Sequence, residues 1–316
     1  SLIELGMVRE VRVKGGLVEV TLALTTMGCP LKNQIVSDVE KAVGALEGVG
    51  EVEVELTEMT EEEKRRIGIG VPHQEKGAAE DLNDIRRVIA VMSGKGGVGK
   101  SSVTSLLACE LARQCKKVGI LDADITGPSI PRLFGLPPGG LRGSEQGLLP
   151  SITSLGIRVV SSNLLVANED AAVIWRGPLI ASAITQFWRD VLWGSLDYLL
   201  VDLPPGTSDA ALTVMQTLPV NGVVLVSTPQ QLAGLVVRKA DSMLKQLGIP
   251  VLGVVENMSY YPCDVSDERH EIFGPSHVDE LAAAIGTDRM LRLPLDPQIT
   301  LLADAGKIED YTSADL

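Results

Sequence analysis

A glycine-rich segment with two lysines has the residue types and spacing that bind the phosphates of a nucleotide. Residues 94–101 fit G-x-x-x-x-G-K-[ST] without a mismatch, between the apolar run 88–92 and a segment with amphipathic helical spacing. Backbone N–H groups of such a loop converge on phosphate oxygens, and the helix start adds its positive end. We expect Lys100 to reach the β- and γ-phosphates of ATP and Ser101 to bind Mg²⁺. The predicted nucleotide contacts here are Gly94, Lys95, Gly96, Gly97, Val98, Gly99, Lys100, Ser101 and Ser102.

Acidic residues end two further apolar runs. Asp122 and Asp124 follow the run 118–121, and Asp202 follows the run 198–201. Open α/β sheets bind ligands at the carboxyl ends of their strands, so these carboxylates are expected near the phosphates. Asp202 is predicted to hold Mg²⁺ through water, Asp124 to orient an attacking water, and Asp122 to support the metal shell. A helix-capping role explains Asp122 about equally well.

Lys95 distinguishes this loop from an ordinary phosphate-binding loop. The pattern Lys-Gly-Gly-x-Gly-Lys-Ser resembles the deviant Walker A motif of the MinD, ParA and nitrogenase iron protein class. That resemblance implies a lysine that crosses a dimer interface and touches the nucleotide of the other subunit. Such a lysine would neutralise charge in the transition state. The alternative is a solvated loop lysine without a role.

The hydrophobic pattern predicts two domains. Residues 1–60 combine alternating strands at 17–24 and 49–56 with an amphipathic helix between them, a small α/β unit. Charged and then aperiodic sequence over 61–84 predicts a linker. Over 85–316, unbroken apolar runs alternate with helical segments, which predicts a doubly wound, mostly parallel α/β sheet. Helices are expected at 101–114, 178–192, 232–247 and 278–285, and a mobile loop at 135–150.

Composition and charge limit the classes of partner. Apolar residues make up 45% of the 316 and the formal net charge is −13, which argues against nucleic acid or an anionic membrane as the main partner. No apolar run approaches the length of a membrane span, and no secretory leader opens the chain. Four cysteines in a chain of this length form no disulfide framework. We therefore expect a cytoplasmic protein.

Five sequence blocks together resemble the Mrp/ApbC family of ATP-dependent iron–sulfur cluster carriers. They lie at 93–101, 121–131, 174–178, 196–207 and 256–260, and residues 25–30 resemble part of the small iron–sulfur assembly domain often fused in front. The resemblance implies a homodimeric ATPase that uses ATP and Mg²⁺, bridges its subunits with a 4Fe–4S cluster and serves apoproteins and an assembly scaffold. It also implies that Asn257 contacts the adenine and that Gln230 lies near the base.

Two departures from the family pattern stand out. The usual opening helix and Asp-Pro-Glu motif of the small domain are missing, so we expect that unit to be truncated. The family's Cys-x-x-Cys reads Cys263-Asp-Val-Ser266 here. Two such pairs would supply the four thiolates of a 4Fe–4S cluster, and serine is a poor substitute. Cys263 is still the predicted cluster ligand, and the cluster is then weak, completed by other thiols, or absent.

The other three cysteines are not predicted to be cluster ligands. Cys109 and Cys115 are expected on the helix that follows the phosphate loop, as buried core residues. Cys29 is either a low-pKa thiol at a helix start or an ordinary turn residue.

Two alternative functions remain open at this point. A positioning ATPase of the MinD or ParA kind would need a basic amphipathic carboxyl-terminal helix or a basic surface, and residues 301–316 are acidic. A regulatory relative that keeps the ATPase and has lost the cluster is compatible with Ser266.

Overall fold

The structure of the protein is a computed structural model in which the chain divides into two compact units, Ser1–Glu75 and Lys76–Leu316. The residues that it describes are 8–24, 32–58, 60, 79–165, 177–263 and 268–313, except 45, 47, 126, 145 and 208. The predicted linker residues 61–78, the segment 25–30 with Cys29, and Ser266 lie outside the described residues.

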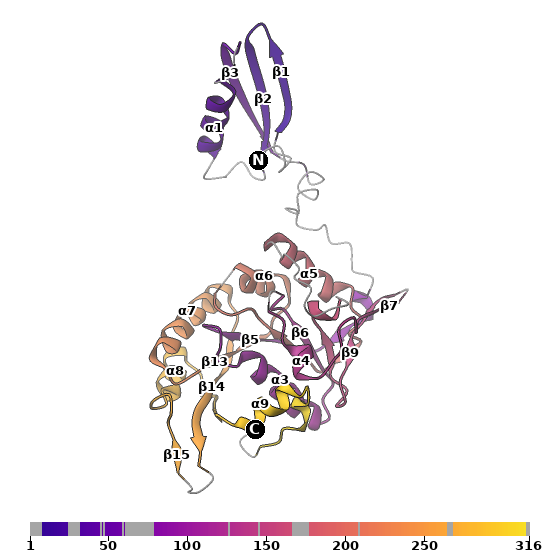
Figure 1. Cartoon of the computed structure of the whole chain (residues 1–316), viewed down its shortest axis with the longest axis vertical. Helices are drawn as coiled ribbons and strands as arrows, with labels where there is room; N and C mark the ends of the chain where they lie inside the picture. The colour runs from indigo at the N-terminus through magenta and orange to yellow at the C-terminus, as the bar shows by residue number, and fades with distance from the viewer. Residues whose placement is uncertain are drawn as a thin grey trace. The chain divides into compact units, whose positions relative to one another are not determined.

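The first unit is a three-stranded sheet with one helix. Its elements are β1 (Val8–Lys14), β2 (Leu17–Leu24), α1 (Lys32–Gly44) and β3 (Glu51–Glu58), as Figure 1 shows. Strand β2 lies in the centre, antiparallel to β1 and parallel to β3. Val18, Val20 and Leu22 alternate with polar residues and pack against Val39 of α1, which explains the period-two pattern. Strand β1 is absent from the prediction because Val11 and Val13, at an edge, stay exposed.

The second unit is built on a nine-stranded sheet with the order β15-β14-β13-β5-β12-β6-β10-β9, in which β16 also pairs with β14. The central strands are parallel, which confirms the predicted doubly wound sheet. Their bounds are β5 Val88–Ser93, β6 Val118–Asp122, β10 Arg158–Val160, β12 Tyr198–Asp202, β13 Gly222–Ser227, β14 Val251–Pro262 and β16 Met290–Pro294. The edge strands β9 (Ser151–Ile152) and β15 (Arg269–His270) are antiparallel to their neighbours.

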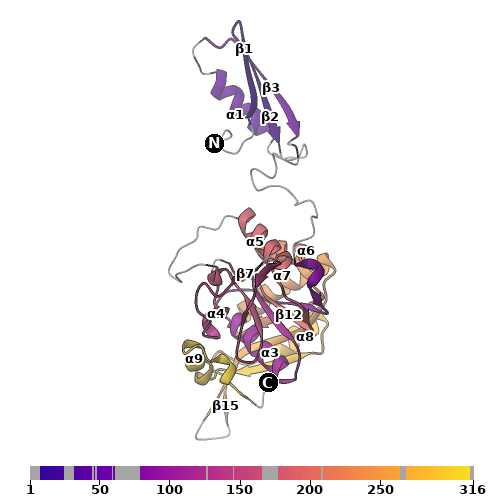
Figure 2. The same cartoon turned by 90° about the vertical axis from the view of Figure 1, so that its right-hand side faces the viewer.

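Helices cover both faces of this sheet (Figures 1 and 2). One core packs the sheet against α5 (Gly177–Arg189), α6 (Asp209–Thr217), α7 (Gln231–Leu247) and α8 (Val278–Ile285). The other packs it against α3 (Lys100–Arg113), α4 (Ile130–Leu133), α9 (Pro297–Asp304) and the turn η3 (Ile308–Asp310). Burial on both faces is the reason that these strands read as unbroken apolar runs.

The remaining short elements lie in the connections between the main strands and helices. Strands β4 (Asp84–Ile85) and β11 (Ser195–Leu196) pair in parallel, and η1 (Glu80–Leu82) and η2 (Ser162–Leu164) are single turns. The segment predicted as a mobile loop contains the hairpin of β7 (Arg142–Ser144) and β8 (Gly147–Leu149). Leu148 donates to the carbonyl of Asp190 at 2.7 Å and accepts from Leu192 at 2.8 Å. Glycines and prolines hide this hairpin in the sequence, so its strands were not predicted, and the mobility of the segment stays a prediction.

Candidate functional site

The phosphate-binding loop connects β5 to α3 at the carboxyl edge of the parallel sheet. Gly97 and Gly99 both have φ of 78°, a left-handed conformation that favours glycine. A Cβ at Gly99 would also collide with the side-chain amide of Asn257. The hydroxyl of Ser93 donates to the carbonyl of Lys95 at 3.0 Å and holds the start of the loop. The glycines therefore set the loop's path and allow side chains from other strands to approach it.

A buried ion pair lies beneath this loop. The Nζ atom of Lys100 is 2.7 Å from Oδ2 of Asp202, and the two side chains are 6% and 0% exposed. Ser101 Oγ donates to the same oxygen at 2.5 Å. Thr104 Oγ1 donates to Oδ1 at 2.7 Å, so both carboxylate oxygens are satisfied. Buried charges are tolerated only with this kind of pairing.

Thr104 is a site residue that the motif does not include. Its signal in the sequence is helical spacing, because a residue three positions after Ser101 on α3 faces the same side.

Asp122 lies beside Asp202, because β6 and β12 pair in parallel with these two residues in register. Complete burial and the neighbouring Asp202 carboxylate raise the pKa of Asp122 to about 8, although Lys100 acts in the opposite direction. Asp122 accepts hydrogen bonds from Ser161 Oγ at 3.1 Å and from the backbone N–H of Ile130 at 3.3 Å. The contact with the first residue of α4 agrees with the capping role, while the carboxylate remains next to that of Asp202.

Asp124 follows two residues later and is half-buried. Its backbone N–H donates to Asp122 Oδ1 at 3.3 Å, and its own Oδ1 accepts from the N–H of Gly127 at 3.3 Å. Asp124 thus lies at the same carboxyl edge of the sheet as Asp122, with which it shares a hydrogen bond.

Side chains that follow β13 and belong to β14 contact the loop from the other direction. The Nζ atom of Lys95 donates to Oε1 of Gln230 at 2.5 Å. The Nδ2 atom of Asn257 donates to the carbonyl of Val98 at 2.9 Å. Four segments far apart in the sequence, around residues 98, 122, 202 and 257, therefore meet at one end of the sheet. This arrangement can hold the phosphates and a hard cation such as Mg²⁺ through hydroxyl and carboxylate oxygens.

Comparisons with known proteins show the family to which the chain belongs. The sequence profile described as "ParA: NUBPL iron-transfer P-loop NTPase" matches residues 84–315, and the profile "Iron-sulfur cluster assembly protein" matches residues 1–55. The chain belongs to the ParA/NUBPL family of iron-transfer P-loop NTPases. The resemblance drawn from the five sequence blocks is thereby confirmed.

Two curated relatives of this P-loop NTPase are named as iron–sulfur cluster carriers. The "Iron-sulfur cluster carrier protein" of Synechocystis is 42% identical over 300 residues, which cover 94% of this chain and 82% of that protein. The protein of the same name from Deinococcus radiodurans is 40% identical over 307 residues, with coverages of 97% and 83%.

Solved structures of two archaeal proteins are similar to the NTPase unit. A nucleotide-binding protein of Archaeoglobus fulgidus, solved in complex with ADP, is 50% identical with a TM-score of 0.66 and coverages of 73% and 90%. The cell division ATPase MinD of Pyrococcus furiosus, 22% identical with a TM-score of 0.52 and coverages of 73% and 93%, shares the fold.

The cysteine that was predicted to bind a cluster lies on an arm formed by the end of β14 and by β15, at the edge of the nine-stranded sheet. Cys263 follows β14 directly, is half-buried, and donates its N–H to the carbonyl of Glu268 at 3.2 Å. Strand β15 pairs with the end of β14 opposite Tyr261 and Pro262. Within the described residues, no group of three or more His, Cys, Asp and Glu is placed to hold a metal ion.

A buried carboxylate on β14 links this strand to the segment before α8. Glu256 is 3% exposed and accepts from Ser259 Oγ at 2.5 Å, from Ser276 Oγ at 2.6 Å and from the N–H of His277 at 3.1 Å. The guanidinium of Arg292 donates to Ser259 Oγ at 2.7 Å. This network ties β14 beside Asn257 to the segment before α8 and to Arg292 of β16.

The two cysteines after the phosphate loop differ in environment. Cys109 on α3 is fully buried, and burial raises the pKa of its thiol to about 12, so it is an inert core residue. Cys115 is exposed and has φ of 60°, because α3 ends at Arg113 and the chain turns there. The prediction of a core position is confirmed for Cys109 and wrong for Cys115.

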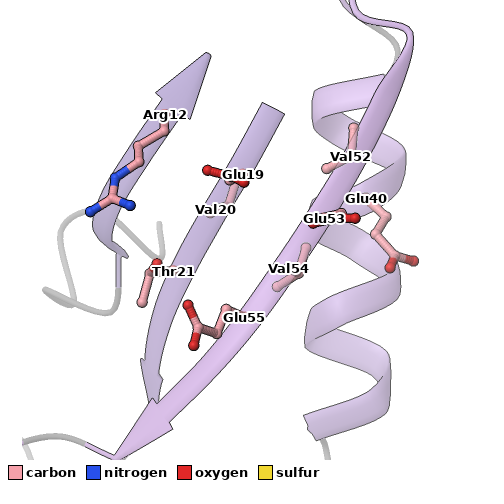
Figure 3. A pocket seen from close by; sticks show the side chains of 9 residues that line it. All are labelled: Arg12, Glu19, Val20, Thr21, Glu40, Val52, Glu53, Val54 and Glu55. Atoms are coloured by element: carbon pink, nitrogen blue, oxygen red, sulfur yellow. The ribbon is translucent and has the colours of Figure 1, made fainter. Parts of the chain in front are cut away.

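The small unit carries a shallow hollow, and Figure 3 shows the side chains that line it. Four of them are glutamates, Glu19, Glu40, Glu53 and Glu55, beside Arg12. Such an acidic surface repels phosphate groups, so this hollow is a poor site for a nucleotide. No helix of the described residues is both long and apolar enough to cross a bilayer.

Replacing Thr104 by valine tests the support of Asp202. The change keeps the shape of the side chain and removes the hydroxyl on Oδ1, so we expect the free energy of unfolding to fall by about 1–3 kcal/mol. Urea denaturation followed by circular dichroism measures this loss. Thr104→Ser keeps the hydroxyl and is the matched control. Equal stability of the Thr104→Val variant and the parent would contradict the assignment.

Proposed function

We propose that this chain is a homodimeric ATPase that binds iron–sulfur clusters and transfers them to apoproteins in the cytoplasm. The buried cluster of Lys100, Ser101 and Asp202 beneath a complete phosphate loop carries this proposal. Relatives named as iron–sulfur cluster carriers, and a relative of Yarrowia lipolytica named "Cytosolic Fe-S cluster assembly factor CFD1" that is 42% identical over 236 residues, support the cargo and the compartment. In this proposal residues 1–60 form the assembly-type domain, 61–84 the linker and 85–316 the ATPase domain.

The residues of the loop divide the work on ATP. Backbone N–H groups of residues 94–102 bind phosphate oxygens, and Lys100 supplies positive charge to the β- and γ-phosphates. Ser101 and Asp202 offer hard oxygen ligands to Mg²⁺, with Asp122 behind them. When bound, Mg²⁺ neutralises charge on the phosphates. Asp124 is the residue that orients the attacking water, and Asn257 is the residue that lies against the adenine.

Hydrolysis is proposed to need a dimer. The Lys95 side chain contacts Gln230, whereas Lys100 of the same loop pairs with Asp202. In this proposal Lys95 supplies charge to the nucleotide of a partner subunit. Activity should then be slow and depend on the protein concentration.

The cluster is cargo, and Cys263 is its proposed ligand. One thiolate from each subunit gives two per dimer, so other thiols would complete a 4Fe–4S cluster. Ser266 in place of a second cysteine is compatible with the alternative that this relative keeps the ATPase and binds no cluster. The proposals make different predictions for bound iron.

Lys100→Ala should weaken ATP binding by about 10- to 100-fold or more, because a charge-assisted contact to the phosphates is lost. Isothermal titration calorimetry with ATP and Mg²⁺ measures the affinity, and circular dichroism checks that the variant is folded. Lys116→Ala, which removes an exposed lysine after the far end of α3, is the matched control and should bind as the parent does. Unchanged affinity in folded Lys100→Ala would overturn the nucleotide site.

Lys95→Ala should lower kcat by about 100-fold or more and change KM little, as expected for a contact made in the transition state. Specific activity of the parent should rise with protein concentration. Phosphate release at several concentrations measures both effects, and Lys117→Ala, at another exposed lysine, serves as the control. Activity that is independent of concentration in a proven monomer would rule out the trans role.

Ser266→Cys should increase the iron retained after anaerobic reconstitution and gel filtration, since each dimer gains two thiolates. Cys263→Ser should remove the remaining iron, whereas Cys115→Ser, at an exposed cysteine outside the arm, should not. Iron and sulfide analysis with visible absorbance measures these changes. If the parent stably holds about four irons per dimer and Cys263→Ser leaves them in place, the ligands lie elsewhere, with Cys29 the first residue to test.

A further inference from the structure

The two lysines of the phosphate loop have different partners in the same subunit. Lys100 points inward to Asp202 and is 6% exposed. Lys95 is half-buried at the loop surface, and its Nζ donates to Gln230 Oε1 at 2.5 Å. The backbone carbonyl of Lys95 accepts from Ser93, so the contact with Gln230 adds a second anchor, this time on the side chain.

Gln230 is well placed to hold this lysine. It immediately precedes α7, with extended dihedral angles of φ −60° and ψ 131°, and its side chain makes no capping hydrogen bond to the helix. Its amide oxygen is therefore available to Lys95. A neutral amide binds an ammonium group less strongly than a carboxylate does, so the contact can exchange for a phosphate oxygen.

We propose that Gln230 holds Lys95 in the free subunit and that this contact must break before Lys95 can reach the nucleotide of a partner subunit. The inference rests on the proposed trans role of Lys95. An interaction made only in the free subunit stabilises that state, so it shifts the equilibrium away from the active dimer. Gln230 is thus a positioning residue that sets the protein concentration at which the specific activity of hydrolysis reaches half of its maximum.

This role differs from a base contact, which the family resemblance implies for Gln230. A residue that touches the base changes the affinity for ATP, and it does so whether or not Lys95 is present. A residue that acts through Lys95 changes the concentration dependence of hydrolysis, and it loses its effect when Lys95 is removed. The two roles can therefore be separated by a double-mutant cycle.

The experiment measures ATP hydrolysis by the full chain across a range of protein concentrations. Gln230→Ala removes the acceptor and should lower the concentration for half-maximal specific activity by about two- to fivefold, the scale of one exposed hydrogen bond. Gln230→Glu replaces the amide with a carboxylate and should raise that concentration. Gln216→Ala, at an exposed glutamine on α6, is the matched control.

The double variant Lys95→Ala, Gln230→Ala should behave as Lys95→Ala alone. An equal change of KM by Gln230→Ala in both backgrounds would overturn the inference in favour of a base contact. Reduced activity of Gln230→Ala at low concentration would overturn it too, since Gln230 would then present the lysine to the partner. If Lys95→Ala lowers kcat while both Gln230 variants match the parent, this inference alone fails. If Lys95→Ala leaves kcat unchanged, the trans role itself fails.

Discussion

The pairing of a buried lysine with a buried aspartate constrains the whole NTPase unit. Lys100 and Asp202 are almost completely removed from water, and either charge left alone would cost several kcal/mol. The start of α3 and the end of β12 must therefore stay in contact, which holds β5 and β12 side by side. Hydroxyls of Ser101 and Thr104 complete the carboxylate's partners. The same charges that demand this order are the ones proposed to act on phosphate and Mg²⁺.

Strand β14 connects the nucleotide site to the candidate cluster site. Asn257 touches the phosphate loop, and Cys263 lies six residues further along the same strand and its extension. Glu256 anchors the first part of this stretch, since its two carboxylate oxygens accept from Ser259 on β14 and from Ser276 and His277 before α8. Strand β14 thus places Asn257, which contacts the phosphate loop, and Cys263 on one continuous segment.

Most of the parallel sheet was predictable, because strands covered on both faces are apolar at every position. Helix α8 has the predicted bounds, and α3 and α7 begin one residue earlier than predicted. Strand β1 and the β7–β8 hairpin were missed for a different reason. In β1, Val11 and Val13 alternate with polar residues, but the run is short and exposed at a sheet edge. The order of the hairpin comes from the bonds of Leu148 to Asp190 and Leu192, which leave no local hydrophobic period.

The sequence by itself determined the phosphate loop, the acids at the strand ends and the family, since all are local patterns of residue type and spacing. Only the tertiary structure decided which side chains meet. Thr104 joins Asp202 across 98 positions of sequence, and Lys95 meets Gln230 across 135. It also decided that Cys115 is exposed while Cys109 is buried, because α3 ends between them. Strand order and helix ends depend on the packing of the complete sheet, so they cannot be predicted from a short segment of sequence.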